Sequence, residues 1–471
     1  MRMFVSVASA LHIAFGCGMR FSAVDACFSK HSMYRQGYLH LLTTRDGNNR
    51  VLPLAWAWCE TESGDTYNWF AQQCYEAGLG RYLNKNSVVF SDRMKGVNEF
   101  FGWFEAYHGH CFQHIIGNAK AHCRGTGTTF ADELAWNMRN AHTKHAFDVH
   151  LAAIRVSSPA AAHYFETQVE HERAYQYALN DKHVATHGFK TSQIVECTNG
   201  VFVEARQHTP YRANNMILSW MGKQYDERLL EITKWLDKSH LLTPYAHREF
   251  SIQVWPLRVC VLVWAHRNMF GPLRVFVLIW AHRNMFGPLL VFVLVWAHRN
   301  IVLQKEIAKR TGHAVTAGGT ADIFYVQRVD TPDATAYEVD FSNGLASVKC
   351  CEYVSINNLP CRHCVPVFYK RGLLSSRRKA ESTISRFWPK WARASVYHDM
   401  YSKKSVRQPQ IFCGEFTGPD EHRRLPPRQD HKRGGRPRKE RYRSKPKSTK
   451  AVKVRLPVVY HGQYQEVMTF L

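Results

Sequence analysis

The chain has 471 residues, of which 45% are hydrophobic, and a formal net charge of +24 at pH 7. This length holds two or three domains, and the apolar content is ordinary for a globular protein, which argues against a chain disordered throughout. No run reaches the ~18 apolar residues of a membrane span. The 13 cysteines lack a compact even spacing, which favours a reducing compartment over a disulfide scaffold.

The first predicted elements form an α/β unit that follows a short remnant at residues 1–19. The turn at 45–49 carries Asp46-Gly47, a pair that accepts positive φ. A helix is predicted from Thr66 to about Tyr75, with Asp65 as its cap. Short apolar runs predict strands at 21–28, 38–43, 51–59 and 87–90. Three antiparallel strands, a helix and a further strand are how an RNase H-like core begins.

The next segment, from about 120 to 190, is predicted to be helical. Apolar residues recur at helical spacing over 132–140, 146–155 and 160–179. Ser192 is expected to cap the following helix, on which Glu196 and Asn199 share a face because they are three residues apart.

Residues 251–300 form an insert that contains a tandem repeat at 257–300. Its period of 16 places Trp264, Trp280 and Trp296 in register. Near-identical copies indicate duplication in the gene, so we interpret the repeat as an insert in a connection, either strand-forming or poorly ordered. A small stack of apolar strands is the alternative.

The rest of the chain divides into a C-terminal region at 301–400, with a cysteine-rich segment at 349–368, and a basic tail at 401–471. Much of the positive excess lies in this tail, which predicts a polyanionic partner, either nucleic acid or an anionic membrane surface. The composition of 415–455 cannot bury a core and predicts disorder.

Three acids are the main catalytic candidates: Asp25, Asp92 and Glu196. The first two each follow a short apolar run, where a carboxylate is costly to bury unless it is paired or bound to metal. Three converging carboxylates can hold two divalent cations that activate a water for phosphodiester cleavage. Two alternatives stay open: unrelated surface acids, or a different third acid in a nearby segment, namely Glu133, Asp148, Glu166 or Glu204.

The segments around these acids resemble the Mutator-like (MULE) transposases. The similar stretches, in order, are VDACFSKHSMYRQGYLHLLTTRDGNNRVLPLAWAWCETES, VVFSDRMKGV, CFQH and SQIVECTNGVFVEAR, with Gln193 where the family more often has Asn. The resemblance covers roughly residues 10–400 apart from the repeat. It implies an RNase H-like catalytic core at 20–250 with an all-helical insertion at about 120–190. It also implies that Asp25, Asp92 and Glu196 hold Mg²⁺ or Mn²⁺ for DNA nicking and strand transfer.

Two cysteine–histidine motifs accompany the acids. In the family a pair like Cys111 and His114 lies between the second Asp and the Glu, and either orients the site or helps to bind metal. The segment 349–368 resembles a SWIM zinc finger, which implies a Zn²⁺ site. Lys349 stands where the first Cys of that pattern belongs, and Cys364 is an additional thiol. The expected zinc ligands are Cys350, Cys351, Cys361 and His363.

The tail contains an AT-hook-like motif, a Gly-Arg-Pro element flanked by cations. Such a segment binds the minor groove of A·T-rich DNA and also resembles a nuclear localisation signal. The alternative is a solvated tail that serves solubility. The DNA-binding candidates are Lys432, Arg433, Arg436, Arg438 and Lys439.

Together these features predict a nuclear DNA transposase acting on double-stranded DNA, away from membranes, with a homo-oligomer left open. One rival is a domesticated or relic protein that binds DNA without cutting it, favoured by the repeat and by Lys349. Another is a regulator whose SWIM-like segment mediates protein contacts.

Overall fold

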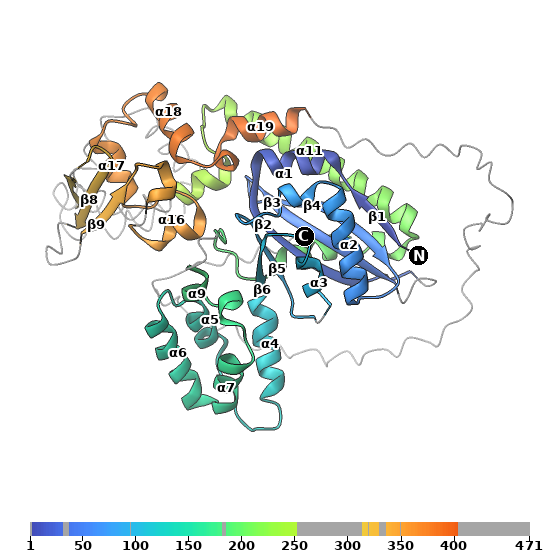
Figure 1. Cartoon of the computed structure of the whole chain (residues 1–471). Helices are drawn as coiled ribbons and strands as arrows, with labels where there is room; N and C mark the ends of the chain where they lie inside the picture. The colour runs from blue at the N-terminus through green and yellow to red at the C-terminus, as the bar shows by residue number, and fades with distance from the viewer. Residues whose placement is uncertain are drawn as a thin grey trace, which may run out of the picture. The chain divides into compact units, whose positions relative to one another are not determined.

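The computed structural model describes residues 2–31, 37–94, 96–180, 185–251, 313–318, 320–328, 336–348 and 350–403 (Figure 1). The repeat at 257–300, Lys349 and the AT-hook-like motif lie outside these residues. The described residues belong to one compact unit, Met1–Pro409. Within them, no helix has the length and apolarity needed to cross a membrane.

A six-stranded mixed sheet is the centre of an α/β fold, in the order β1-β4-β3-β2-β5-β6. Neighbouring strands are antiparallel from β1 to β2, whereas β2, β5 and β6 run parallel to one another. The strands are β1 (Met3–Ser6), β2 (Gly18–Phe28), β3 (Tyr38–Asp46), β4 (Val51–Cys59), β5 (Val88–Ser91) and β6 (Tyr107–His110). The strands predicted at 21–28, 38–43, 51–59 and 87–90 are therefore present, with small differences at their ends.

Two strands of this sheet, β1 and β6, were not predicted. The segment 1–19, which we interpreted as a remnant, supplies β1 and the helix α1 (Ala8–Cys17), and β1 pairs with β4. The strand β6 has the sequence YHGH, which offers no apolar run to recognise. Its polar side chains are buried because β6 pairs with β5 and the histidines pack between strand and helices.

Helices cover both faces of the sheet. On one face, Trp56 and Trp58 of β4 donate from Nε1 to Oδ1 of Asn214 at 2.8 and 2.9 Å. On the other face, the His40 ring packs 4.6 Å from the ring of Tyr67. Asn214 lies on α11 (Pro210–Asp237), and Tyr67 lies on α2 (Gly64–Glu76). The remaining helices and turns here are η1 (Leu79–Arg81), α3 (Asn98–Phe101), α10 (Gln193–Val201) and η2 (Ala205–Gln207).

Two local predictions need correction. The cap of α2 is Ser63, whose side chain accepts from the Thr66 amide in a capping box, and Asp65 lies inside the first turn. In the β3–β4 turn the positive φ of 60° falls on Asn49 rather than on Gly47. Gly47 is needed for space, because a Cβ there would lie 1.9 Å from the Trp391 carbonyl oxygen.

The helical segment has a hydrophobic core of its own, which includes Phe112, Phe147, Phe165 and Tyr175. Helices are present as predicted, but they begin at residue 112, ahead of the expected 120. The single helix expected over 160–179 is broken into three, because the chain folds back to bury Tyr175 beside Phe147. The helices are α4 (Phe112–His122), α5 (Asp132–Asn140), α6 (Lys144–Ser157), α7 (Pro159–Thr167), α8 (His171–Ala174) and α9 (Gln176–Asn180).

The C-terminal region carries a three-stranded antiparallel sheet and short helices. The sheet order is β7-β8-β9, and a hydrophobic cluster of Phe341, Phe368 and Phe387 packs behind it. The elements are β7 (His313–Ala317), β8 (Ile323–Arg328), β9 (Tyr337–Asp340), η3 (Gly344–Ser347), α16 (Glu352–Asn357), α17 (Cys364–Lys370), α18 (Arg377–Phe387), η4 (Lys390–Ala392) and α19 (Ala394–Ser402).

A buried polar network joins α19 to the main sheet. Oδ2 of Asp46, at the end of β3, accepts from Arg228 at 3.1 Å, from Tyr397 at 2.9 Å and from Tyr401 at 2.6 Å. Its Oδ1 accepts from the backbone amides of Asn48 and Arg50. The Asp46 carboxylate is therefore fully paired although its side chain has no solvent exposure.

Candidate functional site: a carboxylate cluster and two cysteine–histidine groups

Asp25 lies on the face of the sheet that α10 covers. It pairs with Leu41 across β2 and β3, and its Oδ2 accepts from Nδ2 of Asn199 on α10 at 3.3 Å. The pKa of Asp25 is raised from 3.8 to about 7, most of all by burial and then by the negative charge of Asp92, with smaller contributions from Glu62 and Glu196. Asp25, Asp92 and Glu196, which are distant in sequence, therefore interact electrostatically.

Glu62 is a fourth acid of this cluster that sequence reasoning did not identify. Burial raises its pKa, and the charge of Asp92 adds to the effect. Its Oε1 accepts from the hydroxyl of Tyr67 at 3.2 Å. Glu62 lies in the loop between β4 and α2, where an acid is usually solvated, so no pattern distinguished it from Glu60 beside it.

A chain of hydrogen bonds supports the backbone at Asp92. Arg173 donates to Nδ1 of His108 at 3.0 Å, and Nε2 of that ring lies 2.7 Å from Oγ of Ser91. The Ser91 hydroxyl donates to the carbonyl oxygen of Asp92 at 2.7 Å. Burial, with the charges of His110 and Arg173, lowers the pKa of His108 to about 2, so the ring is neutral and can accept from Arg173. The end of β5 is thereby held in place.

Glu196 lies in the first turn of α10, four residues after Ser192. Ser192 is the N-cap residue, as predicted, but its side chain caps no amide and instead donates to Oε1 of Glu196 at 3.1 Å. The same oxygen lies 3.8 Å from Nδ1 of His114. Glu196 and Asn199 share a face of α10, as expected, because both interact with Asp25.

Cys111, His114 and Glu196 form a compact group whose candidate ligand atoms all lie within 4.8 Å of one another. The Cys111 side chain is fully buried before α4. Burial raises the pKa of its thiol, but the His114 ring and Ser192 outweigh that effect and lower the pKa overall. The thiol in turn raises the pKa of His114 to about 9, with further contributions from Glu196 and Asp92.

The other acids considered for the third position do not join this cluster. Asp148 pairs with Lys144 within α6, and Glu166 pairs with Arg155. The strongest influences of other acids on the pKa of Asp25 come from Asp92, Glu62 and Glu196, and not from these two acids or from Glu133 or Glu204. Their positions leave Glu196 as the acid that interacts with Asp25 from α10.

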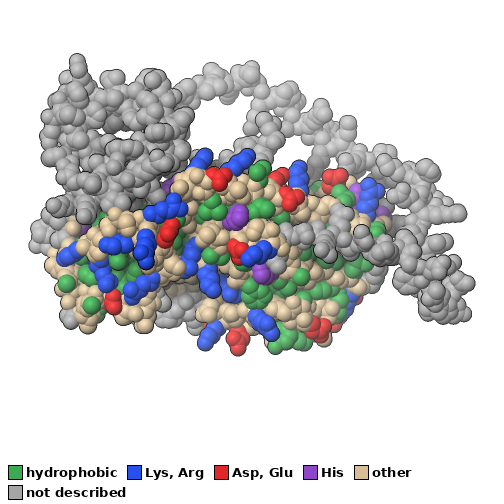
Figure 2. Space-filling model, turned by 90° about the horizontal axis from the view of Figure 1, so that it is seen from above, with side chains coloured by type: hydrophobic (Ala, Val, Ile, Leu, Met, Phe, Trp, Pro, Cys, Tyr) green, Lys and Arg blue, Asp and Glu red, His purple; other side chains and the backbone are tan. Residues whose placement is uncertain are grey.

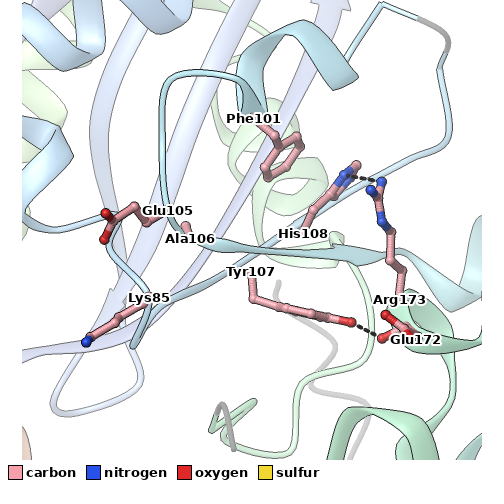
Figure 3. A pocket seen from close by; sticks show the side chains of 8 residues that line it. All are labelled: Lys85, Phe101, Glu105, Ala106, Tyr107, His108, Glu172 and Arg173. Carbon is pink, nitrogen blue, oxygen red and sulfur yellow. Dashed lines mark hydrogen bonds between the residues drawn. The ribbon is translucent and has the colours of Figure 1, made fainter. Parts of the chain in front are cut away.

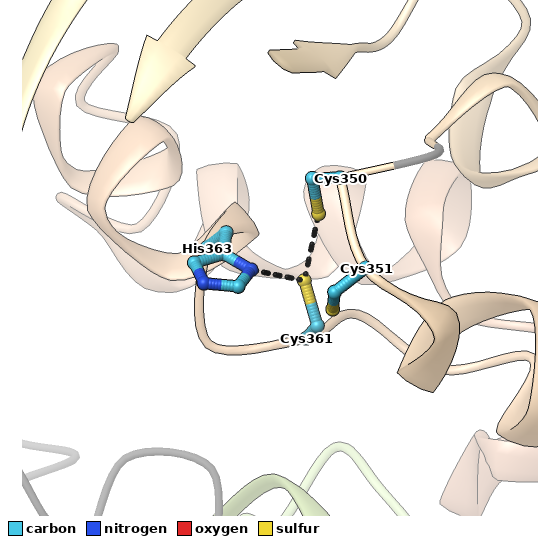
Figure 4. Close-up of side chains that lie close together, drawn as sticks. All are labelled: Cys350, Cys351, Cys361 and His363. Carbon is cyan, nitrogen blue, oxygen red and sulfur yellow. Dashed lines mark hydrogen bonds between the residues drawn. The ribbon is translucent and has the colours of Figure 1, made fainter. Parts of the chain in front are cut away.

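The second cysteine–histidine group contains the four residues expected from the SWIM-like pattern. Candidate ligand atoms of Cys350, Cys351, Cys361 and His363 all lie within 4.8 Å of one another (Figure 4). The Cys361 sulfur lies 3.2 Å from that of Cys350 and 3.8 Å from Nδ1 of His363. This group could hold a metal ion such as zinc, since three sulfur atoms and one imidazole are a usual ligand set for structural zinc.

Three of the four residues are buried, namely Cys350, Cys361 and His363. The His363 ring stacks on Tyr337 of β9 with 4.0 Å between centroids. Adjacent thiols lower the pKa of Cys361, with Cys350 contributing most. Cys364, which opens α17, is also buried, with its sulfur 3.6 Å from that of Cys361. Among the described residues, these two groups meet the 4.8 Å spacing; the three carboxylates Asp25, Asp92 and Glu196 do not.

A separate cavity of about 490 Å³ opens beside β6 (Figure 3). The Tyr107 hydroxyl donates to the carbonyl oxygen of Glu172 at its rim, and Arg173 bonds His108 as described above. None of the candidate catalytic or zinc-binding residues lines the cavity. The lining residues are Lys85, Phe101, Glu105, Ala106, Tyr107, His108, Glu172 and Arg173.

Comparisons with protein-family models and with curated proteins found no match to this chain.

Proposed function

We propose that the protein is a metal-dependent DNA transposase of the Mutator-like type, with an RNase H-like core. The observation that carries the proposal is the electrostatic interaction of Asp25 with Asp92, Glu62 and Glu196. Holding several carboxylates close together is unfavourable unless a cation compensates them, and burial at Asp25 adds to the cost. The strand order supports the core assignment. The neighbouring strands β2, β3 and β4 are antiparallel, and β5 and β6, which follow them in the chain, run parallel to β2.

The donor set fits a hard divalent cation. Asp25, Asp92 and Glu196 present carboxylate oxygens, which Mg²⁺ and Mn²⁺ prefer. When bound there, such ions would supply an activated water and stabilise the charge that develops on a phosphodiester. Within the chain, Asn199 orients Asp25, the Ser91 hydrogen bonds hold the backbone at Asp92, and Ser192 orients Glu196.

DNA is the proposed partner because cations are abundant both in the tail and in the described part. Figure 2 shows Lys and Arg side chains spread more widely than Asp and Glu over one face. On α18, Arg377, Arg378 and Lys379 are exposed. Exposed cations contact phosphates without regard to base sequence. The tail motif from Lys432 to Lys439 adds a minor-groove element, and a nuclear location follows from the same residues.

The deciding experiment is a nicking assay on transposon-end DNA with Mg²⁺ or Mn²⁺. We expect Asp92→Asn to lower the nicking rate by at least ~100-fold, in line with losses of one charge-stabilising group. The matched control is Glu133→Gln, an exposed acid of the helical segment, which should nick like the unaltered chain. If the unaltered chain binds the DNA but never nicks it, the protein is the relic DNA-binding form and the catalytic proposal is wrong.

A further inference from the structure

We propose that Arg139 and Lys190 form a binding site for a phosphate group, at the point where the helical segment leads into α10. Arg139 lies in the last turn of α5 and is only 1% exposed. Lys190 is partly buried in the segment between α9 and α10. Its carbonyl oxygen accepts from the amide of Phe112 at the start of α4. The fold therefore holds the backbone of both residues in place.

The guanidinium group of Arg139 has one edge free for a ligand. Its Nη1 donates to Oε1 of Gln176 at 2.9 Å, which joins α5 to α9 (Figure 1). Nε and Nη2 are buried and have no hydrogen-bond partner among the described residues. These two atoms form one side of the planar group, and their N–H groups match two oxygens of an oxyanion. Two buried donors without partners cost free energy, which a bound oxyanion would recover.

The charges of the two residues also favour an anion. Burial lowers the pKa of Arg139 to about 9. The pKa of Lys190 is lowered to about 8, most of all by burial and then by the positive charge of Arg139. Both side chains therefore stay cationic at pH 7, and no acid among the described residues contributes to either pKa. Two cations held near one another away from water are unfavourable unless an anion compensates them.

The arrangement suits a phosphate better than a carboxylate. A carboxylate has two oxygens, both of which the free edge of Arg139 would use, whereas a phosphate has a further oxygen for Lys190. Because Lys190 is only partly buried, an anion can reach the pair from its side. Free phosphate and a backbone phosphate of DNA share this chemistry. The site depends on its own two cations and stands whether or not the chain cuts DNA.

The test compares Lys190→Gln with Arg124→Gln in the full-length protein. Arg124 is an exposed residue of the same helical segment, so both variants lose one positive charge. Thermal unfolding is measured in sodium phosphate and in sodium chloride at equal ionic strength. We expect phosphate to raise the Tm of the unaltered protein and of Arg124→Gln, because a ligand that binds the folded state stabilises it. In Lys190→Gln the rise should be less than half as large.

A second variant separates hydrogen bonding from charge. Arg139→Lys keeps the positive charge but loses the paired N–H groups of the guanidinium edge. We expect its Tm to respond to phosphate less than half as strongly as that of Arg124→Gln. Lys190→Gln alters a partly exposed side chain, so it keeps the test open if Arg139→Lys does not fold.

A DNA-binding measurement identifies the source of the phosphate. The affinity for a short duplex is measured at several salt concentrations with a chelator present, so that no nicking takes place. Loss of one phosphate contact lowers the slope of log affinity against log salt by ~0.9. A lower slope in Lys190→Gln than in Arg124→Gln identifies a DNA phosphate, whereas equal slopes with unequal phosphate responses identify free phosphate. Equal phosphate responses in all three variants, together with equal slopes, would overturn the proposal.

Discussion

The carboxylate cluster and the C-terminal cysteine-rich group assemble potential metal ligands over very different lengths of chain. The cysteine-rich group draws all four residues from 350–363, so the short helix α16 and the turn before α17 bring them together. The carboxylate cluster joins β2, the end of β5 and α10, with Glu62 added from a loop. The cysteine-rich group can therefore be recognised from a short stretch of sequence, whereas the carboxylate cluster forms only once the sheet has formed.

The two regions also handle buried charge differently. In the cysteine-rich group, neighbouring thiols lower the pKa of Cys361, whereas hydrogen bonds to the other thiols raise the pKa of Cys350, so one thiolate is favoured ahead of the rest. In the carboxylate cluster, burial and the other acids raise the pKa of Asp25, which favours its protonated form in the absence of a cation. Both groups therefore release protons as a metal ion binds, but the cysteine-rich group has one thiolate already favoured.

The largest expected effect is on the cysteine-rich group. Replacing Cys361 by serine removes the sulfur closest to the other ligands, so zinc bound there should be lost. Structural zinc contributes on the order of 10 kcal/mol of apparent binding free energy in small fingers. We expect elemental analysis to show one equivalent less zinc than in Cys197→Ser, which alters an exposed cysteine of α10. Retention of that zinc would mean that Cys364 takes over as a ligand.

The network that joins the C-terminal region to the sheet gives the next largest effect. Asp46→Ala leaves Arg228 buried without its carboxylate and removes the acceptor of two tyrosine hydroxyls. Breaking such a buried pair costs about 3–5 kcal/mol of unfolding free energy, measured by urea denaturation. Glu231→Ala is the control, because its pair with Arg50 is about half exposed and should be worth less than ~1 kcal/mol. Equal effects would show that the network is not what holds α19 in place.

The pH dependence of the metal-free protein sharpens the comparison at Asp25. Since its folded pKa of about 7 exceeds its ordinary value of 3.8, the folded state holds the proton more tightly than the unfolded state. Its contribution to stability is therefore greatest below the ordinary pKa and falls as pH rises from about 4 to about 7. Asp25→Asn should flatten this slope and stabilise the protein at pH 8 by on the order of 2 kcal/mol. Denaturation curves at pH 5 and pH 8 with a chelator present test this, and parallel curves for the two proteins would contradict it.

The smallest effect is expected at Ser192. Its hydroxyl donates to Glu196, whose side chain is 41% exposed, so Ser192→Ala should cost ~0.5–1 kcal/mol of unfolding free energy. Cys197→Ser, on the same helix, should cost less. A loss well above 1 kcal/mol at Ser192 would mean that the start of α10 depends on this contact more than the geometry indicates.

The sequence alone determined the elements with strong local patterns. Val51–Cys59 was predicted to its ends because it is a short apolar run that follows a turn, and α5 was predicted to its ends by its helical spacing. The residues Cys350, Cys351, Cys361 and His363 were predicted from the resemblance to the SWIM pattern, and the structure brings them together. Although Lys349 stands where the first Cys of that pattern belongs, the Cys350 sulfur lies 3.2 Å from that of Cys361. These features depend on neighbours along the chain, whose positions the covalent backbone already restricts.

Only the tertiary structure decided the rest. The strand Tyr107–His110 forms because β5 offers it hydrogen bonds, not because its residues favour a strand. Asp46 was expected only as a turn residue, but Arg228 and two tyrosines from distant helices make it a buried anchor. Glu62 belongs to the carboxylate cluster because the loop before α2 lies near Asp92. In each case the decisive partner is far away in sequence, so its effect arises only after the sheet and helices have packed.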